Sequence, residues 1–194
     1  MGERGKIVTA IARAVAEYGY SQLTLEQVLS DAAVSAEGFE AQFDSLEQGL
    51  IAAQDDFLQR LRLEVASACE VDRPWPDQVR AALDAALSYL ADAHALARGF
   101  VVEATAASLV ASERQFAALE DFTELLREGR RLYPEAAGMP ASTERALIGG
   151  IASIVCDRLL AEEHQALARL EPQFAEFLLV PYLGRAEASR FARN

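Results

Sequence analysis

The side chains that most often bind metals or act as nucleophiles are scarce in this sequence. There are two histidines, His94 and His164, and two cysteines, Cys69 and Cys156, and they lie far apart along the chain. Zinc sites and disulfide frameworks need such residues at close, repeated spacing. We therefore expect free thiols, ordinary histidines and no bound metal. No nucleophile with its base, no phosphate-binding loop and no dinucleotide fingerprint occurs, so the sequence predicts neither an enzyme nor a cofactor.

Carboxylates dominate the N-terminal third of the chain. The 46 residues from 14 to 59 contain no lysine or arginine and nine acidic residues: Glu17, Glu26, Asp31, Glu37, Glu40, Asp44, Glu47, Asp55 and Asp56. The whole chain has 18 basic and 30 acidic residues, which gives a net charge of −12. Such a charge repels DNA and anionic membranes at long range, although a local basic patch could still bind them.

The bulk composition indicates a globular protein of the cytoplasm. The chain has 194 residues, of which 52% are hydrophobic, so it can bury a sizeable core. The longest uncharged apolar run, residues 146–156, is too short to span a membrane, and no signal-peptide pattern follows the N-terminus. With two thiols expected to be reduced, we predict a cytoplasmic protein without a membrane segment.

The spacing of apolar residues predicts an all-α fold. Apolar residues recur at helical intervals, alanine is abundant and strand signals are almost absent. Thr24 with Gln27 and Ser45 with Gln48 match the capping box that starts a helix. Nine helices are expected, at about residues 3–18, 24–33, 35–42, 45–69, 76–93, 95–107, 112–132, 143–168 and from 171 onward, where Pro181 should kink or break the last one.

Several segments resemble the tetracycline-repressor (TetR) family of transcriptional regulators. The N-terminal match comprises Thr24-Leu25-Glu26-Gln27-Val28, Ala32-Ala33-Val34-Ser35, the Phe39 and Phe43 pair, and Ser45-Leu46-Glu47; the C-terminal match comprises residues 146–151 and 181–184. The resemblance implies a nine-helix, all-α architecture with a helix-turn-helix DNA-binding domain at 1–47. Residues 48–194 would then form a ligand-binding and dimerisation domain. It further implies a ligand-responsive regulator that binds operator DNA as a homodimer.

The DNA-binding residues implied by the resemblance surround the third helix. They are Thr24, Ser35, Ala36, Glu37, Gly38, Phe39, Gln42 and Ser45. The apolar residues that hold this helix are kept, but its contact residues depart from the family pattern. Glu40 stands where the family usually has a phosphate-binding tyrosine, and Leu46 stands where a lysine is common. Helix N-termini and the basic residues Arg4, Lys6 and Arg13 could supply phosphate contacts.

Two interpretations of the acidic N-terminal segment, residues 1–47, stay open; we call this segment the head. In the first, the protein is a repressor that reads bases with few charged contacts, for example through Gln42. In the second, it is a TetR-fold binding module whose DNA binding is weak or lost, and it acts through a small molecule or a protein partner. Duplex binding normally rests on several lysine or arginine contacts to phosphate, which is why the charge pattern keeps the second interpretation open.

Aromatic residues and one carboxylate are candidates for a pocket that binds a small apolar effector. They are Phe57, Trp75, Tyr89, Phe100, Glu103, Phe116 and Phe122. Each aromatic residue could equally belong to the core. Glu103 lies in an apolar stretch, where it could face a ligand, point to solvent or pair with an arginine.

The eighth and ninth helices are expected to form the homodimer interface. Residues 147–159 are apolar on more than one side of the helix, and Gly149 and Gly150 would allow a partner helix to approach closely. The expected interface residues are Leu147, Ile151, Ile154, Val155, Leu159, Phe174, Phe177 and Leu178.

Overall fold

The structure is a computed structural model that describes residues 2–69 and 72–191. Within these ranges the chain is all-α, as predicted, and contains no strand. None of the helices there combines the length and hydropathy that a bilayer-spanning segment requires. The chain forms two compact units: unit 1 consists of Met1–Arg60 and Ala93–Gln115, and unit 2 of Leu61–Asp92 and Phe116–Asn194. The functional division predicted at residues 47 and 48 stays a prediction.

Unit 1 is built around the N-terminal helices. Its elements are α1 (Glu3–Tyr18), the 3₁₀ turn η1 (Tyr20–Gln22), α2 (Leu25–Ala32), α3 (Ala36–Glu40), the first part of α4 (Leu46–Ala68), α6 (His94–Ala97), the π-helix η2 (Arg98–Glu103), α7 (Ala104–Ala107) and the start of α8 (Leu109–Leu132). Helix α1 packs against α2, α3, α6 and η2. It buries Ile7, Ile11 and Val15, which recur every four residues and so share one face.

The α3 helix is held in place by two aromatic rings. Phe39 and Phe43 are almost fully buried, and their ring centroids lie 5.6 Å apart. Phe39 also lies beneath Gly49 of α4, where a β-carbon would come within 3.6 Å of its ring. The two rings therefore fix the inner face of α3 in the core of unit 1 and leave its outer face to solvent, as predicted from the apolar pattern.

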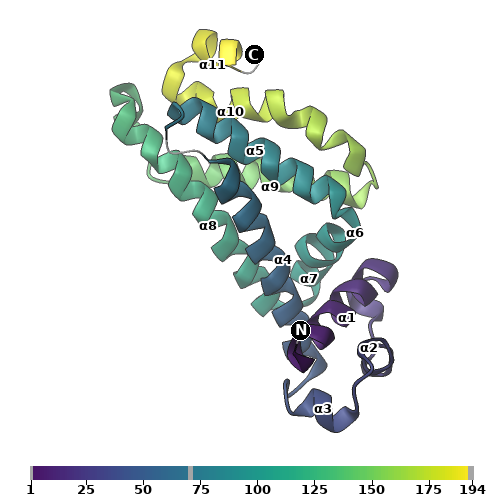
Figure 1. Cartoon of the computed structure of the whole chain (residues 1–194). Coiled ribbons are helices and arrows are strands. Elements are labelled where there is room, and N and C mark those ends of the chain that lie inside the picture. Colours follow the sequence, from purple (N-terminus) through teal and green to yellow (C-terminus); the bar gives the residue numbers. More distant parts are fainter. Residues whose placement is uncertain (1, 70–71, 192–194) are drawn as a thin grey trace. The chain divides into compact units, whose positions relative to one another are not determined.

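Unit 2 contains the remaining helices, and α5, α9 and α10, which belong to it, are labelled in Figure 1. Its elements are α5 (Trp75–Asp92), the rest of α4 and α8, η3 (Pro134–Gly138), α9 (Thr143–Leu160), the turns η4 (His164–Ala166) and η5 (Ala168–Leu170), α10 (Glu171–Leu183) and α11 (Arg185–Phe191). Helix α10 packs against α5, α9 and α11. Trp75 of α5 and Tyr182 of α10 meet edge to face, with ring centroids 4.8 Å apart.

The predicted sixth and seventh helices differ from the structure. Instead of one helix at 95–107, the chain forms α6, the π-helix η2 and α7. Helix α8 begins at Leu109, three residues before the predicted start at Ser112. The reason is that the hydroxyl of Ser108 accepts a hydrogen bond from the N–H of Ala111 and so caps the helix one turn earlier.

Two predictions about the last helices also need correction. The helix expected at 143–168 ends at Leu160, because Glu162 adopts a left-handed backbone with φ of 59° and two 3₁₀ turns follow. Pro181 does not end its helix, since α10 continues to Leu183. Gly184, with a φ of 73°, caps the end of α10, and the separate helix α11 follows it.

Candidate functional site

The helix-turn-helix region of unit 1 has the local geometry that the sequence predicts. Thr24 accepts a hydrogen bond from the N–H of Gln27, whose side chain accepts one in return from the N–H of Thr24. Ser35 caps α3 by accepting from the N–H of Gly38 at 3.1 Å. Ser45 caps α4 by accepting from the N–H of Gln48 at 3.2 Å. These bonds fix where α2, α3 and α4 begin.

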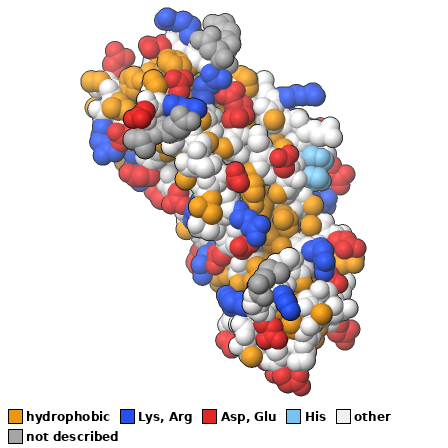
Figure 2. Space-filling model, viewed as in Figure 1, with side chains coloured by type: hydrophobic (Ala, Val, Ile, Leu, Met, Phe, Trp, Pro, Cys, Tyr) orange, Lys and Arg blue, Asp and Glu red, His pale blue; other side chains and the backbone are white. Residues whose placement is uncertain are grey.

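The exposed face of α3 is acidic. Glu37 and Glu40 are exposed, and Figure 2 shows red acidic side chains at the lower edge of the view, over the segment labelled α3 in Figure 1. The pKa of Glu37 lies below its ordinary value, because its own backbone N–H and the Ser35 hydroxyl donate hydrogen bonds to the carboxylate. Glu37 is therefore ionised at neutral pH. Any duplex that approached α3 would meet negative charge.

Two of the three basic residues near α1 are engaged within the head. The guanidinium carbon of Arg4 lies 4.4 Å from the centroid of the Phe43 ring, and Arg4 donates a hydrogen bond to the carbonyl of Gln42. Arg13 forms an ion pair with Asp31 at 3.2 Å and also donates to the carbonyl of that residue. Both contacts are exposed, so a phosphate could compete for them, but each competition lowers the gain from binding.

The π-helix η2 lies against the head. The Oε2 atom of Glu103 accepts a hydrogen bond from the backbone N–H of Tyr20 at 2.8 Å, and its Oε1 atom pairs with Arg98 at 3.2 Å. Of the roles left open for Glu103, the structure therefore shows the arginine pair. It adds a contact that the sequence did not indicate, because Tyr20 and Glu103 are 83 residues apart.

The predicted ligand residues are divided between the two units, and their role in binding an effector stays a prediction. Phe57 and Phe100 are buried in unit 1 with ring centroids 5.7 Å apart, and Glu103 belongs to the same unit. The other four predicted residues belong to unit 2. There Trp75 is buried and donates its indole N–H to the carbonyl of Leu125 at 3.0 Å, whereas Tyr89 and Phe122 are half-buried.

One predicted ligand residue lines a cavity. Phe116 of α8, whose side chain is 69% exposed, borders a cavity of about 280 Å³ in unit 2. The other residues that line it come from α8 and α9: Leu119, Glu120, Thr123, Arg145, Ile148 and Gly149. A β-carbon on Gly149 would meet nothing within 4 Å. The side chains of Phe116, Leu119 and Ile148 make the cavity largely apolar, and the ion pair of Glu120 with Arg145 at 3.1 Å lies in its wall.

The predicted dimer residues fall into two groups. Six are buried inside unit 2: Leu147, Ile151, Val155, Leu159, Phe174 and Leu178. Ile154 of α9 and Phe177 of α10 remain exposed at 41% and 48%. Leu160, at the end of α9, is exposed at 55%. The exposed large apolar side chains of α9 and α10 are thus Ile154, Leu160 and Phe177. We call the surface that carries Ile154 and Phe177 the α9–α10 apolar face.

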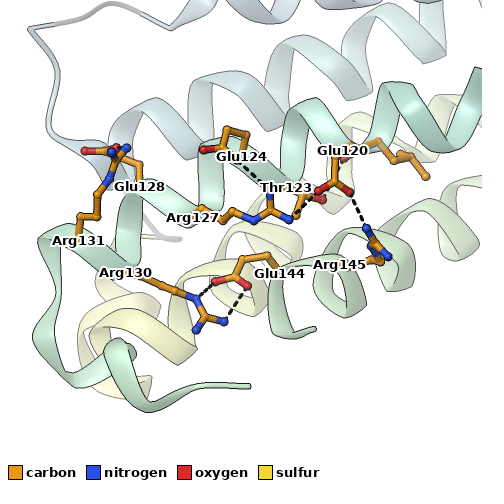
Figure 3. A network of polar contacts seen from close by, with 10 residues as sticks. Glu120, Thr123, Glu124, Arg127, Glu128, Arg130, Arg131, Glu144 and Arg145 are labelled. Atoms are coloured by element: carbon orange, nitrogen blue, oxygen red, sulfur yellow. Dashed lines mark hydrogen bonds and ion pairs between the residues drawn. The ribbon is translucent and has the colours of Figure 1, made fainter. Parts of the chain in front are cut away.

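A polar network that the sequence did not indicate joins α8 to α9 (Figure 3). Arg130 donates two hydrogen bonds to the carboxylate of Glu144, one of them at 2.8 Å to Oε2. Glu144 is only 1% exposed, and the hydroxyl of Tyr182 donates to it at 3.2 Å. Near by, Glu120 accepts from Arg127 at 2.6 Å and from Arg145 at 3.1 Å. Such charges look like ordinary surface residues in a sequence.

The metal prediction concerned His94, His164, Cys69 and Cys156. Among the described residues, no group of three or more histidine, cysteine or acidic side chains could hold a metal ion. The two thiols are free and half-buried. Burial raises the pKa of both, and the carboxylate of Asp157 raises that of Cys156 further, so both are protonated at neutral pH.

Solved structures with the same fold are regulators, although no protein-family model and no curated protein matches the sequence. The fatty acid degradation regulator FadR from Bacillus halodurans has a TM-score of 0.80 and 20% identity, covering 92% of this chain and 95% of its own. FadR from Bacillus subtilis, in complex with stearoyl-CoA, has a TM-score of 0.71 and 19% identity over 93% and 98%. A tetR-family regulatory protein from Rhodococcus RHA1 has a TM-score of 0.70 and 18% identity over 94% and 97%. The chain therefore has the fold of TetR-family regulators.

Proposed function

We propose that this chain is a ligand-responsive transcriptional regulator that binds operator DNA as a homodimer. The observation that carries the proposal is the head of unit 1. Its short α2 and α3 are set by side-chain caps and its α3 is anchored by Phe39 and Phe43, in a chain whose fold matches TetR-type regulators over more than nine-tenths of its length. An anchored inner face and a solvent-facing outer face are what a recognition helix requires.

In this proposal α3 enters the major groove with few charged contacts. Gln42, two residues beyond the C-terminal end of α3, supplies an amide that can pair with adenine. The N-terminal ends of α2 and α4 offer backbone N–H groups to phosphates. Lys6 on α1 is exposed and adds one cation. The residues assigned to this surface remain those predicted: Thr24, Ser35, Ala36, Glu37, Gly38, Gln42 and Ser45 around the buried Phe39.

The effector is proposed to be small and largely apolar. The cavity between α8 and α9 measures about 280 Å³, which lies just below the range of about 300–1,000 Å³ that is usual for pockets of drug-sized ligands. Its lining by Phe116, Leu119 and Ile148 suits an apolar ligand. The Bacillus subtilis FadR binds stearoyl-CoA, but the size of this cavity favours a much shorter molecule here.

A second candidate function is that of a TetR-fold binding module whose DNA binding is weak or lost. The observation that favours it is the exposed carboxylate pair Glu37 and Glu40 on α3, together with the engagement of Arg4 and Arg13 inside the head. On this alternative the protein acts through its small-molecule site or through a protein partner. Its cytoplasmic location remains a prediction under both functions.

Retention of genomic DNA separates the two candidates. Purified protein would be mixed with sheared genomic DNA at about 50 mM and about 200 mM salt, and the retained fragments would be sequenced. A regulator should retain a discrete palindromic site, with an affinity that falls only shallowly with salt because few phosphates are neutralised. A folded dimer that retains nothing at the lower salt would favour the binding module.

A double substitution tests whether the acidic departures weaken the head. Glu40→Tyr with Leu46→Lys introduces the residue types common in the family, and each new lysine–phosphate contact should steepen the slope of log K against log salt by about 0.9. A dimer contributes two such contacts. Leu109→Lys, on an exposed residue outside α1–α4, controls for the added charge alone. An unchanged and already tight affinity would contradict the charge argument.

A further inference from the structure

The π-helix η2 is held in its unusual geometry by side chains from other turns. Well under 1% of residues in proteins adopt π-helix, and single π-turns occur often at functional sites. Three consecutive carbonyls of η2 lie within hydrogen-bond distance of two side-chain donors, the amide of Gln54 and the single hydroxyl of Thr105. The amide of Gln54 donates to the carbonyl of Phe100 at 3.1 Å. The hydroxyl of Thr105 lies 3.1 Å from the carbonyl of Val101 and 2.9 Å from that of Val102.

The Gln54 support has a cost that an apolar residue would not have. Gln54 is fully buried, and its amide nitrogen donates both to Phe100 and to the carbonyl of Ala111 in α8. Its Oε1 atom has no partner among the described residues. An unpaired buried carbonyl destabilises the folded state. We infer that an amide occupies position 54 because its N–H groups satisfy two carbonyls, that of Phe100 in η2 and that of Ala111 in α8.

The last residue of η2 holds the turn between α1 and α2. Glu103 accepts the N–H of Tyr20 at 2.8 Å, and the preceding Gly19 is the point of closest approach. A β-carbon on Gly19 would lie 2.9 Å from Oε2 of Glu103, and its φ of 85° suits glycine in any case. At the other end of η2, a β-carbon on Gly99 would lie 2.3 Å from Cγ1 of Val15. The π-helix is thus in close contact with α1 at Val15 and with the turn that follows α1 at Gly19 and Tyr20.

We propose that η2 is a conformational switch whose π form locks the head through Glu103 and whose conversion to regular α-helix releases it. A π-turn contains an extra residue relative to an α-turn. Removing that extra residue rotates everything beyond it by about 100°. Glu103, at the end of the segment, would then leave the N–H of Tyr20. The regulatory use of this switch, release or capture of DNA, rests on the proposed function; the lock itself does not.

Hydrogen exchange at the amide of Tyr20 tests the lock without DNA or ligand. Glu103→Ala removes the acceptor, and Thr105→Val removes the hydroxyl that supports the π form without touching Tyr20. We expect both variants to raise the exchange rate of this amide about tenfold or more, measured by NMR on the full chain. Amides in the core of unit 1, at Ile11 and Leu58, should keep their protection, which shows that the opening is local.

Three further variants make the test specific. Thr105→Ser keeps the hydroxyl and should restore wild-type exchange at Tyr20, and Gln54→Met should act like Thr105→Val. Thr9→Val is the matched control, because the Thr9 hydroxyl donates to the carbonyl of Gly5 in the regular helix α1 at 2.8 Å. It should leave Tyr20 unchanged. If Glu103→Ala opens Tyr20 but Thr105→Val and Gln54→Met do not, the switch is refuted; if none of them does, the lock is refuted as well.

Discussion

At the scale of single residues, the buried carboxylate of Glu144 forms an ion pair that connects several helices of unit 2. The carboxylate is 1% exposed, yet it receives two hydrogen bonds from Arg130 and one from Tyr182. Arg130 also donates to the carbonyl of Met139 at 2.7 Å. A buried ion pair of this kind seldom adds much net stability, but losing one partner is costly because the other is left buried and unpaired. The group joins α8, the turn after it, α9 and α10.

The pH dependence of stability should report on Glu144. Burial alone would raise its pKa, but the hydrogen bonds and charge of Arg130 outweigh burial and hold the pKa below its ordinary value. A carboxyl whose pKa is depressed by folding contributes stability above its unfolded pKa, which is about 4.3, and that stability is lost as the pH falls through the folded value. The free energy of unfolding should therefore drop in acid below about pH 4.3.

Glu144→Gln identifies the source of that drop. The variant keeps the shape of the side chain and cannot titrate, so it should be less stable at pH 7 by about 1–3 kcal/mol and show a flatter decline in acid. Urea unfolding between pH 3 and 7 measures both effects. Glu135→Gln, at an exposed position in η3, serves as the control. An equal acid slope in wild type and Glu144→Gln would assign the decline to other carboxylates.

Two glycines of unit 2 should respond in opposite ways to alanine. A β-carbon on Gly129 would lie 2.5 Å from the Trp75 ring and 2.8 Å from the Tyr182 ring, whereas one on Gly149 would meet nothing within 4 Å. Overpacking typically costs about 1–3 kcal/mol, and an exposed helical glycine gives up about 0.5–1 kcal/mol relative to alanine. Gly129→Ala should therefore lower the melting temperature and Gly149→Ala should raise it. Equal shifts would contradict this account of the packing around Gly129.

At the scale of elements, a structural feature could be predicted from the sequence where the residues that cause it are close together in the chain. The starts of α2 and α4 follow from capping pairs three residues apart, Thr24 with Gln27 and Ser45 with Gln48, and both were predicted correctly. The π-helix was missed, because the support of its Phe100 carbonyl comes from Gln54, 46 residues away. The same holds for the Tyr20 to Glu103 contact. Long-range pairs leave no periodic signal in a single sequence.

Helix α3, the proposed recognition helix, should become more stable when its glycine is replaced. Gly38 lies in the middle of a helix of only five residues, and a β-carbon there would make ordinary contacts at 3.5 Å with Glu3 and Ser35. Gly38→Ala should raise helix propensity by up to about 1 kcal/mol and slow amide exchange within α3 about threefold to fivefold. Gly49→Ala is the contrasting variant, because its β-carbon would lie 2.7 Å from Ile11; it should destabilise unit 1. Faster exchange in Gly38→Ala would show that the glycine is required.

At the scale of the whole molecule, a net charge of −12 sets the conditions under which the protein could bind DNA. Self-repulsion and repulsion from the duplex both weaken with salt, while the few phosphate contacts of the head weaken as well. In a dimer, two heads bind the two half-sites of one palindrome, so the binding free energies of the two heads combine. This gain matters more here than in a basic regulator, because each acidic head alone binds DNA weakly in this proposal. If the chain has the proposed function, dimer formation is therefore the property on which its operator binding most depends.

The α9–α10 apolar face is the surface we expect to hold the second copy. In a twofold interface each residue occurs twice, so replacing Ile154 and Phe177 with serine removes four apolar side chains. We expect Ile154→Ser with Phe177→Ser to weaken the dimer at least about a hundredfold, as measured by sedimentation at micromolar concentrations. Leu109→Ser, on a side chain that is 85% exposed but lies on α8, should leave the dimer intact.

The same variant pair separates assembly from folding. Both changed side chains are about half exposed in unit 2, so the monomer should keep its helical content and unfold with only a small loss of stability. The retained palindromic fragments should be lost together with the dimer, since a single head lacks the second half-site. A double variant that remains a dimer would place the interface on another face, and a dimer that dissociates with Leu109→Ser would point to α8.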